Sequence, residues 1–127
     1  MDLAKLVLAI EASADGSEYL DYSIQRLFGL KKPVPLYTRS VDAALALVPE
    51  GFSLHRLQQR TDCRGNFASW LAELYRATDV VIDIPSTSSA ATAPLALCGA
   101  ALRVIRALQD AADQRGLPEI VAAHATR

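Results

Sequence analysis

The side chains that could carry out hydrolysis are a group of serine hydroxyls and one histidine. The stretch Ser86–Ser89 offers nucleophiles, and His55 lies in a segment that a strand would hold in place. A serine attacks a substrate when a base within hydrogen-bond distance takes its proton, and Asp79 or Asp83 is available to orient the histidine. The chain has no G-x-S-x-G sequence, which presents the nucleophile in many hydrolases. A small hydrolase is therefore an alternative function, and we expect the protein not to be an enzyme.

The cysteines, histidines and glycines do not have the spacing of a metal or cofactor site. Neither a C-x-x-C nor an H-x-x-x-H pattern occurs, and no glycine motif resembles a phosphate-binding loop or a dinucleotide fingerprint. We therefore predict no metal and no cofactor. We also predict that Cys63 and Cys98 stay reduced, because Cys98 falls in an apolar helical pattern in which a thiol simply packs.

Arginine and aromatic side chains gather in the central third of the chain. The group consists of Arg56, Arg60, Arg64, Trp70 and Arg76. Guanidinium groups beside aromatic rings are suited to binding phosphates and bases. Acidic residues interrupt the same region, and the whole chain has 13 basic and 14 acidic residues, for a formal net charge of −1. Nucleic-acid binding by an arginine and aromatic sheet face is therefore an alternative function rather than the expected one.

These side chains must be positioned by the elements that the hydrophobic pattern predicts. Apolar residues spaced i, i+3, i+4 and i+7 indicate a helix within the first dozen residues. Ser17 can cap a second helix that ends before Gly29, and Ser40 can cap a short helix from Val41 to Val48. The prolines between these two helices exclude a continuous helix there.

The second half of the chain reads as strands, turns and one long helix. Strands are predicted at Phe52–Gln58 and Asp79–Ile84, and a hairpin loop is predicted at Asp62–Asn66. A polar loop is predicted at Ser86–Thr92, and the longest helix is predicted from Pro94 to about Gln114. The segment Phe67–Arg76 has two interpretations, because its apolar residues fit one face of a helix and also alternate as in a strand. Periodicity alone favours the helix.

Length and composition indicate one domain with a core of its own. The chain has 127 residues, of which 51% are hydrophobic, and no interdomain linker or internal repeat interrupts residues 1–127. No apolar run approaches the roughly 18 residues of a membrane span. The N-terminal residues carry an acid, Asp2, where a signal peptide carries positive charge. We therefore expect a cytoplasmic protein that does not enter a membrane.

Two stretches resemble a known family. Residues 37–51 read YTRSVDAALALVPEG and look like the signature Y-T-x-S-x-D-A-A-L-x-L-V-P-E-G of the small phage ABA-sandwich-domain proteins, which are uncharacterised proteins encoded in bacterial genomes and prophages. Residues 91–102 read ATAPLALCGAAL and are similar to the closing A-T-x-P-L-A-L-C-x-A-A-L helix of that family. The pair Leu20-Asp21 also matches the L-D of its second helix.

The resemblance implies a fold rather than an activity. It implies an α+β domain in which helices pack on two sides of a small antiparallel sheet of three or four strands, and it makes Phe67–Arg76 a strand. It carries no catalytic residues. Together with the lack of a catalytic set, it favours a small non-enzymatic phage or prophage accessory protein that acts by protein–protein interaction.

The closing helix has apolar residues on more than one side. Leu97, Ala100 and Val104 lie off its main apolar stripe, and a helix that is apolar nearly all round is normally buried all round. Two arrangements would bury this side of the helix. It could pack against a second copy of the chain in a homodimer, or against the N-terminal helices of the same monomer. We predict these three residues as an interface.

Overall fold

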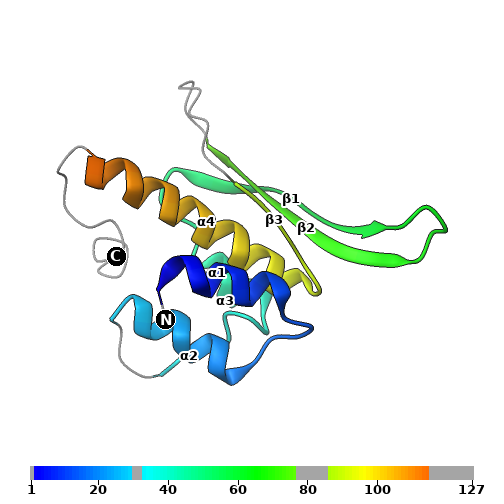
Figure 1. Ribbon diagram of the computed structural model, residues 1–127, viewed down its shortest axis with the longest axis horizontal. Coiled ribbons are helices and arrows are strands. Elements are labelled where there is room, and N and C mark those ends of the chain that lie inside the picture. The colour runs from blue at the N-terminus through cyan, green and yellow to red at the C-terminus, as the bar shows by residue number, and fades with distance from the viewer. Residues whose placement is uncertain (1, 30–32, 77–85, 115–127) are drawn as a thin grey trace.

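Four helices and three strands make up the described part of the chain. The computed structural model describes residues 2–29, 33–76 and 86–114 (Figure 1). The elements are α1 (Leu3–Ala12), α2 (Glu18–Leu27), α3 (Val41–Leu45), β1 (Phe52–Thr61), β2 (Phe67–Arg76), β3 (Thr87–Ala90) and α4 (Ala93–Gln114). The predicted α+β class with a small antiparallel sheet is confirmed, and the strand order is β1-β2-β3. The strand predicted at Asp79–Ile84 lies outside the described residues.

Short polar side chains begin the N-terminal helices as predicted. Ser17 Oγ accepts a hydrogen bond from the amide of Leu20 at 3.1 Å, so one of the unpaired amides of the first turn of α2 has a partner. Ser40 does the same for α3. The helix α3 is shorter than predicted and ends at Leu45, because Pro49 restricts the residue before it and the chain approaches that proline in tight turns.

The strands β1 and β2 form a long hairpin. β1 continues to Thr61, beyond its predicted end, and the predicted loop Asp62–Asn66 is confirmed. Asp62 Oδ1 accepts hydrogen bonds from the amides of Arg64 at 2.8 Å and Asn66 at 3.0 Å. Gly65 has a φ of +81°, which a glycine adopts without steric cost.

The segment Phe67–Arg76 is the strand β2, as the resemblance implied, and the helical interpretation is wrong. Ala72 and Leu74 are buried in the core, whereas Glu73 between them is half-buried and the next residue, Tyr75, is exposed. The helical period misled because residues four positions apart share a face in a helix and in a strand alike. The hydrogen bonds to β1 and β3 are what make this segment a strand.

The prediction of a polar loop at Ser86–Thr92 is wrong for most of this segment. Thr87–Ala90 is β3, an edge strand that pairs antiparallel with β2 between Trp70 and Glu73. Serine and alanine are not among the β-branched and aromatic residues that are enriched in strands, but here the free edge of β2 supplies their hydrogen bonds. Small side chains also allow α4 to lie close to the strand.

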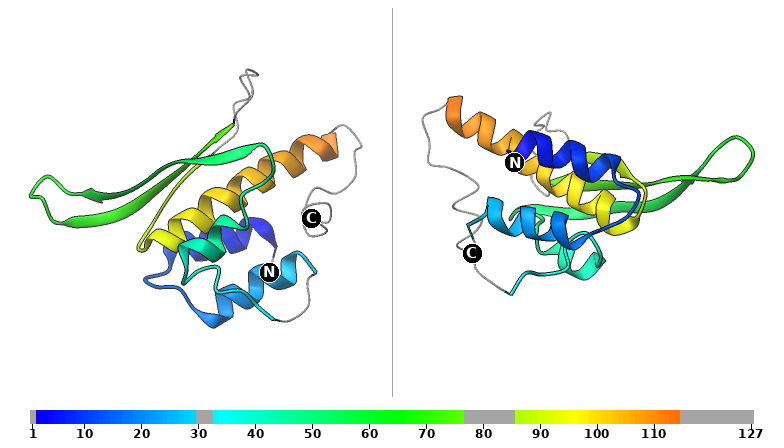
Figure 2. Two further views of the ribbon diagram at one scale, coloured as in Figure 1. Left: turned by 180° about the vertical axis from the view of Figure 1, so that it is seen from behind. Right: turned by 60° about the horizontal axis from the view of Figure 1, so that its bottom comes forward.

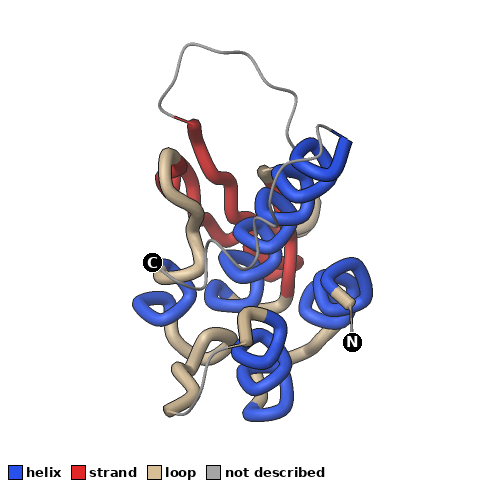
Figure 3. Tube along the Cα trace, turned by 90° about the vertical axis from the view of Figure 1, so that its left-hand side faces the viewer, coloured by secondary structure: helices blue, strands red, loops and turns tan. Residues whose placement is uncertain are grey.

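The sheet has one covered face and one open face. α4 contacts all three strands, α1 packs on α4 and β3, α2 packs on α1, and α3 packs on α4 (Figure 2; Figure 3). Ala72 and Ser88 face these helices and are buried, whereas Tyr75 and Ser89 face the other way and are exposed. Among residues 2–29, 33–76 and 86–114, no helix covers the second face. The two-sided helix arrangement implied by the resemblance is therefore not what the described chain shows.

The three residues predicted as an interface lie inside the monomer. Leu97, Ala100 and Val104 are each 0% exposed, because α4 is enclosed by the sheet, α1 and α3 of its own chain. They offer no surface to a second copy, so this prediction is wrong. The alternative, in which the N-terminal helices cover this side of α4, is confirmed for α1.

Candidate binding surfaces

A buried carboxylate fixes the turn between α2 and α3. Asp21 is fully buried, and its Oδ1 accepts two hydrogen bonds from Thr38, one from the amide and one from the hydroxyl, both of 2.6 Å. Its Oδ2 accepts a hydrogen bond from Arg39 Nε at 2.8 Å. Thr38 Oγ1 in turn accepts one from the amide of Ser17 at 3.0 Å. The carboxylate is thus paired through both oxygens, as a buried charge requires.

The two stretches that resemble the family meet α2 at this point. The thiol of Cys98 donates to the carbonyl of Tyr37 at 3.0 Å, which joins α4 to the turn. The hydroxyl of Tyr37 donates to Gln25 Oε1 at 2.8 Å, which joins the turn to α2. Burial, with the charge of Asp21 nearby, raises the pKa of the Cys98 thiol, so the thiol stays protonated. The motif residues therefore hold the fold together rather than react.

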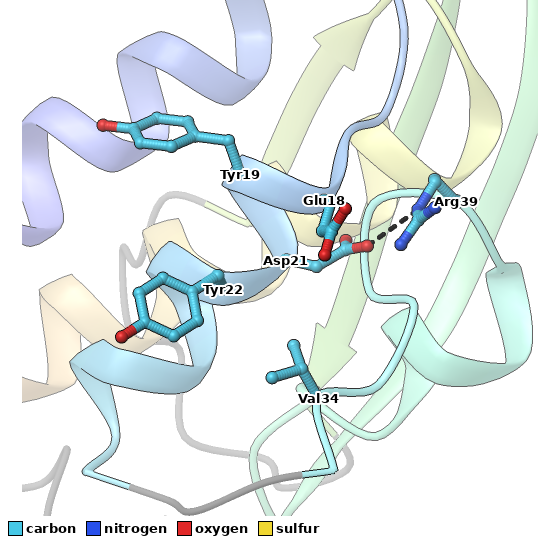
Figure 4. Close-up of a pocket in the computed structure, with 6 residues that line it drawn as sticks. All are labelled: Glu18, Tyr19, Asp21, Tyr22, Val34 and Arg39. Atoms are coloured by element: carbon cyan, nitrogen blue, oxygen red, sulfur yellow. Dashed lines mark hydrogen bonds and ion pairs between the residues drawn. The ribbon is translucent and has the colours of Figure 1, made fainter.

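A cleft of about 730 Å³ opens beside this anchor. Its lining residues are Glu18, Tyr19, Asp21, Tyr22, Val34 and Arg39 (Figure 4). The two tyrosines are 63% and 47% exposed, and their rings project from α2 away from the Arg39 guanidinium. A ligand site normally has polar groups that converge on one point. Here the aromatic and charged parts of the wall diverge, and Arg39 is already paired with Asp21.

No sequence motif marked these cleft residues as a site. Tyr19 and Tyr22 are three positions apart, which places them together on the solvent side of α2, and that spacing was the available signal. Asp21 was noted only as part of the family resemblance. Its role depends on Thr38, which is 17 residues away in the chain.

The structure does not bring together the residues of the hydrolase alternative. His55 lies on β1 with its ring 5.9 Å from that of Tyr75 and its Nε2 3.7 Å from Glu73 Oε1, on the open face. Ser88 faces the helices, where its hydroxyl donates to Glu11 Oε2 at 2.6 Å. Ser89 is on the open face, but β2 separates its strand from β1. No described serine of this stretch is paired with the histidine.

A second polar cluster joins α1, β3 and α4. Glu11 receives hydrogen bonds from Arg103 Nε and Nη2, both of 2.6 Å, in addition to the one from Ser88. Burial alone would raise the pKa of Glu11, but these hydrogen bonds and the charge of Arg103 outweigh it and hold the pKa below its ordinary value. Gly99 lies directly against Ser88, since a Cβ at this position would collide with the Ser88 hydroxyl. These residues stabilise the packing of three elements.

The predicted arginine and aromatic face divides between the two sides of the sheet. Arg56 and Arg60 pair across the ladder with Glu73 and Ser69, which places them on the open face. Trp70 and Arg76 belong to the covered face, where Trp70 packs against the core and the Arg76 guanidinium lies 5.5 Å from the centre of the Phe52 ring. Arg64 lies in the hairpin loop. The prediction that all five residues share a single face is therefore wrong.

The tip of the hairpin projects away from the body of the protein. β3 pairs with β2 only as far as Trp70, and beyond this point the two strands continue without a third (Figure 1). Every residue from 58 to 68 is exposed. We call residues 58–68 the hairpin arm. It includes Arg60, Arg64 and the ring of Phe67, which is 49% exposed.

The two cysteines lie in different parts of the fold. Cys63 is exposed in the hairpin arm and Cys98 is buried in α4, and both are free. Among the described residues, no group of three or more His, Cys, Asp or Glu side chains is placed to hold a metal ion. In the same part of the chain, no helix is long and apolar enough to cross a membrane.

Comparisons with known proteins did not extend the family resemblance. No family model matches the chain, and no curated protein or solved structure matches it. The geometry of the molecule itself therefore carries the evidence on function.

Proposed function

We propose that this chain is a small non-enzymatic accessory protein of the phage or prophage type that acts by binding a protein partner. The observation that carries the proposal is the hairpin arm, in which every residue is exposed. A two-stranded hairpin without a third strand or a helix to pack on is marginally stable in water. A partner that packs against the arm would supply the burial that the monomer does not.

The composition of the hairpin arm supports a protein partner. Arginine and aromatic residues are enriched where proteins contact one another, and Arg60, Arg64 and Phe67 are all accessible. The diverging groups of the α2 cleft and the separation of His55 from Ser88 support a binding role over a catalytic one. The family resemblance supports the accessory context.

Nucleic-acid binding is a second candidate, favoured by one observation. Arg56 and Arg60 share the open face, and neither forms an ion pair within the described residues. Glu73 lies on the same face, however, and Trp70 and Arg76 lie on the other, so the positive charge is not continuous. If this candidate is correct, binding of a single-stranded oligonucleotide will fall steeply as salt rises. The absence of a mobility shift at low salt would exclude it.

Site-specific photo-crosslinking tests the proposed function. Benzoylphenylalanine would replace Phe67 on the hairpin arm or, as a control, Leu36 on the α2–α3 connection, since both side chains are 49% exposed. We expect a protein adduct of discrete mass from the Phe67 position only, in cells of the organism that encodes the chain. Once the adduct is identified by mass spectrometry, the purified partner should bind a Phe67→Ser variant more weakly. Equal adducts from both positions, or none from either, would contradict the proposal.

A further inference from the structure

The outer edge of β1 is a strand edge without a neighbour. β1 is the terminal strand of the order β1-β2-β3, and it is 10 residues long. Within the described residues, nothing else joins this side of the sheet. The backbone amides and carbonyls that point away from β2 are therefore available to another strand. Such an edge is a template for the addition of an extended segment.

Only the middle of this edge is regular. The ladder with β2 shifts register between Leu54 and Arg56 and again between Arg60 and Thr61. Between these irregularities, residues 56–60 pair one to one with residues 73–69. A bulge twists a strand and disrupts further pairing. The part of the edge that suits a docked strand is therefore the segment Arg56–Arg60.

Both ends of this segment carry an unpaired positive charge. Arg56 and Arg60 are exposed, are four positions apart on the open face, and make no ion pair within the described residues. The rise of about 3.3 Å per residue separates their positions on the strand by about 13 Å. On the other face of the segment, Leu57 is half-buried at the rim of the core.

These charges disfavour a second copy of β1 as the occupant. In a two-fold antiparallel pair centred on Gln58, Arg56 of each strand would lie opposite Arg60 of the other. Like charges directly opposite each other destabilise a sheet. The same positions would stabilise a strand that carries carboxylates.

We propose that the edge segment Arg56–Arg60 binds an extended strand of a partner protein with two acidic side chains four positions apart on one face and apolar side chains on the other. The strand adds to β1 by main-chain hydrogen bonds. Its carboxylates meet the two guanidinium groups on the open face, and an apolar residue packs beside Leu57. This inference rests on the proposed protein-binding function and names the chemistry of the partner.

A synthetic strand tests the inference on the full chain. The probe is the peptide acetyl-TVEVTVEVT-amide, in which the glutamates share one face and the valines the other. We expect binding that weakens with salt and slows hydrogen exchange at alternate amides of residues 56–60, because alternate amides of a strand face its outer edge. The peptide with lysine in place of both glutamates should bind at least about tenfold more weakly.

Matched variants assign the binding to the two arginines. The double variant Arg56→Glu with Arg60→Glu should weaken glutamate-peptide binding at least about tenfold and bind the lysine peptide instead. Arg106→Glu, an exposed charge reversal on α4, should change neither affinity. Thermal unfolding of each variant checks that it is folded, and Arg56→Gln with Arg60→Gln replaces the double variant if it is not.

Three results would overturn the inference. They are equal binding of the two peptides, protection of amides outside residues 56–60, and protection of the same amides by a single-stranded oligonucleotide but not by the glutamate peptide. If the peptide fails while the crosslink from Phe67 persists, the partner docks in another way and the proposed function stands. Loss of that crosslink as well would overturn both.

Discussion

Asp21 and Thr38 lie 17 residues apart in the chain and are joined by two hydrogen bonds of 2.6 Å to the same carboxylate oxygen. One comes from the amide of Thr38 and the other from its hydroxyl. The pair attaches the start of the YTRS segment to α2, and Arg39 extends the attachment to the other oxygen of Asp21. Gly16 lies so close to the carbonyl of Thr38 that a Cβ there would collide with it. Close packing at Gly16 and the hydrogen bonds of Asp21 together hold this turn against α2.

Replacing Asp21 should cost a large part of the stability. Asp21→Ala leaves the amide of Thr38 buried without a partner, and we expect the free energy of unfolding to fall by about 3 kcal/mol. Asp21→Asn retains an acceptor oxygen for Thr38 and should cost less. Urea denaturation measures both, with Asp110→Ala on the exposed side of α4 as the control. A loss for Asp21→Ala no larger than that of the control would contradict this role.

The ion pair between Glu11 and Arg103 should make the free energy of unfolding depend on pH in the acid range. Because its pKa is lowered in the folded chain from the ordinary value of 4.5, its contribution is present above that pH and is lost as the pH falls through the folded-state pKa. The stability difference between the wild type and Glu11→Gln should therefore shrink between about pH 6 and about pH 3. Denaturation at several pH values measures it. Glu50→Gln, an exposed control, should follow the wild type at each pH, and parallel curves for Glu11→Gln would contradict the prediction.

The contact between Gly99 and Ser88 should appear as coupling between two substitutions. Gly99→Ala places a methyl group against the Ser88 hydroxyl, which forces β3 and α4 apart and disturbs the hydrogen bond to Glu11. We expect a loss of about 1–3 kcal/mol. Adding Ser88→Ala removes the hydroxyl and should recover part of that loss, so the two changes will not add. If the effects of the two substitutions add in thermal or urea unfolding, the two positions are not coupled and the prediction is wrong.

Elements whose signals are local could be predicted from the amino-acid sequence. Serine caps, the glycine after α2, the Asp62–Asn66 loop and the apolar period of α4 each depend on neighbours within a few residues, and all were predicted close to their observed bounds. The lack of metal-ligand spacing and of a nucleophile motif was also evident from the amino-acid sequence.

Features that depend on distant partners could not be predicted in this way, because they are set by contacts made in the folded chain. Thr87–Ala90 is a strand because β2 offers it an edge, and Phe67–Arg76 is a strand because both of its neighbours pair with it. Pairing register also separated Arg56 from Trp70, since adjacent positions along a strand face opposite sides. Leu97 looked available in the sequence, but α1 and α3 pack around its helix. Burial and face are properties of contacts between distant segments, and no local pattern specifies those contacts.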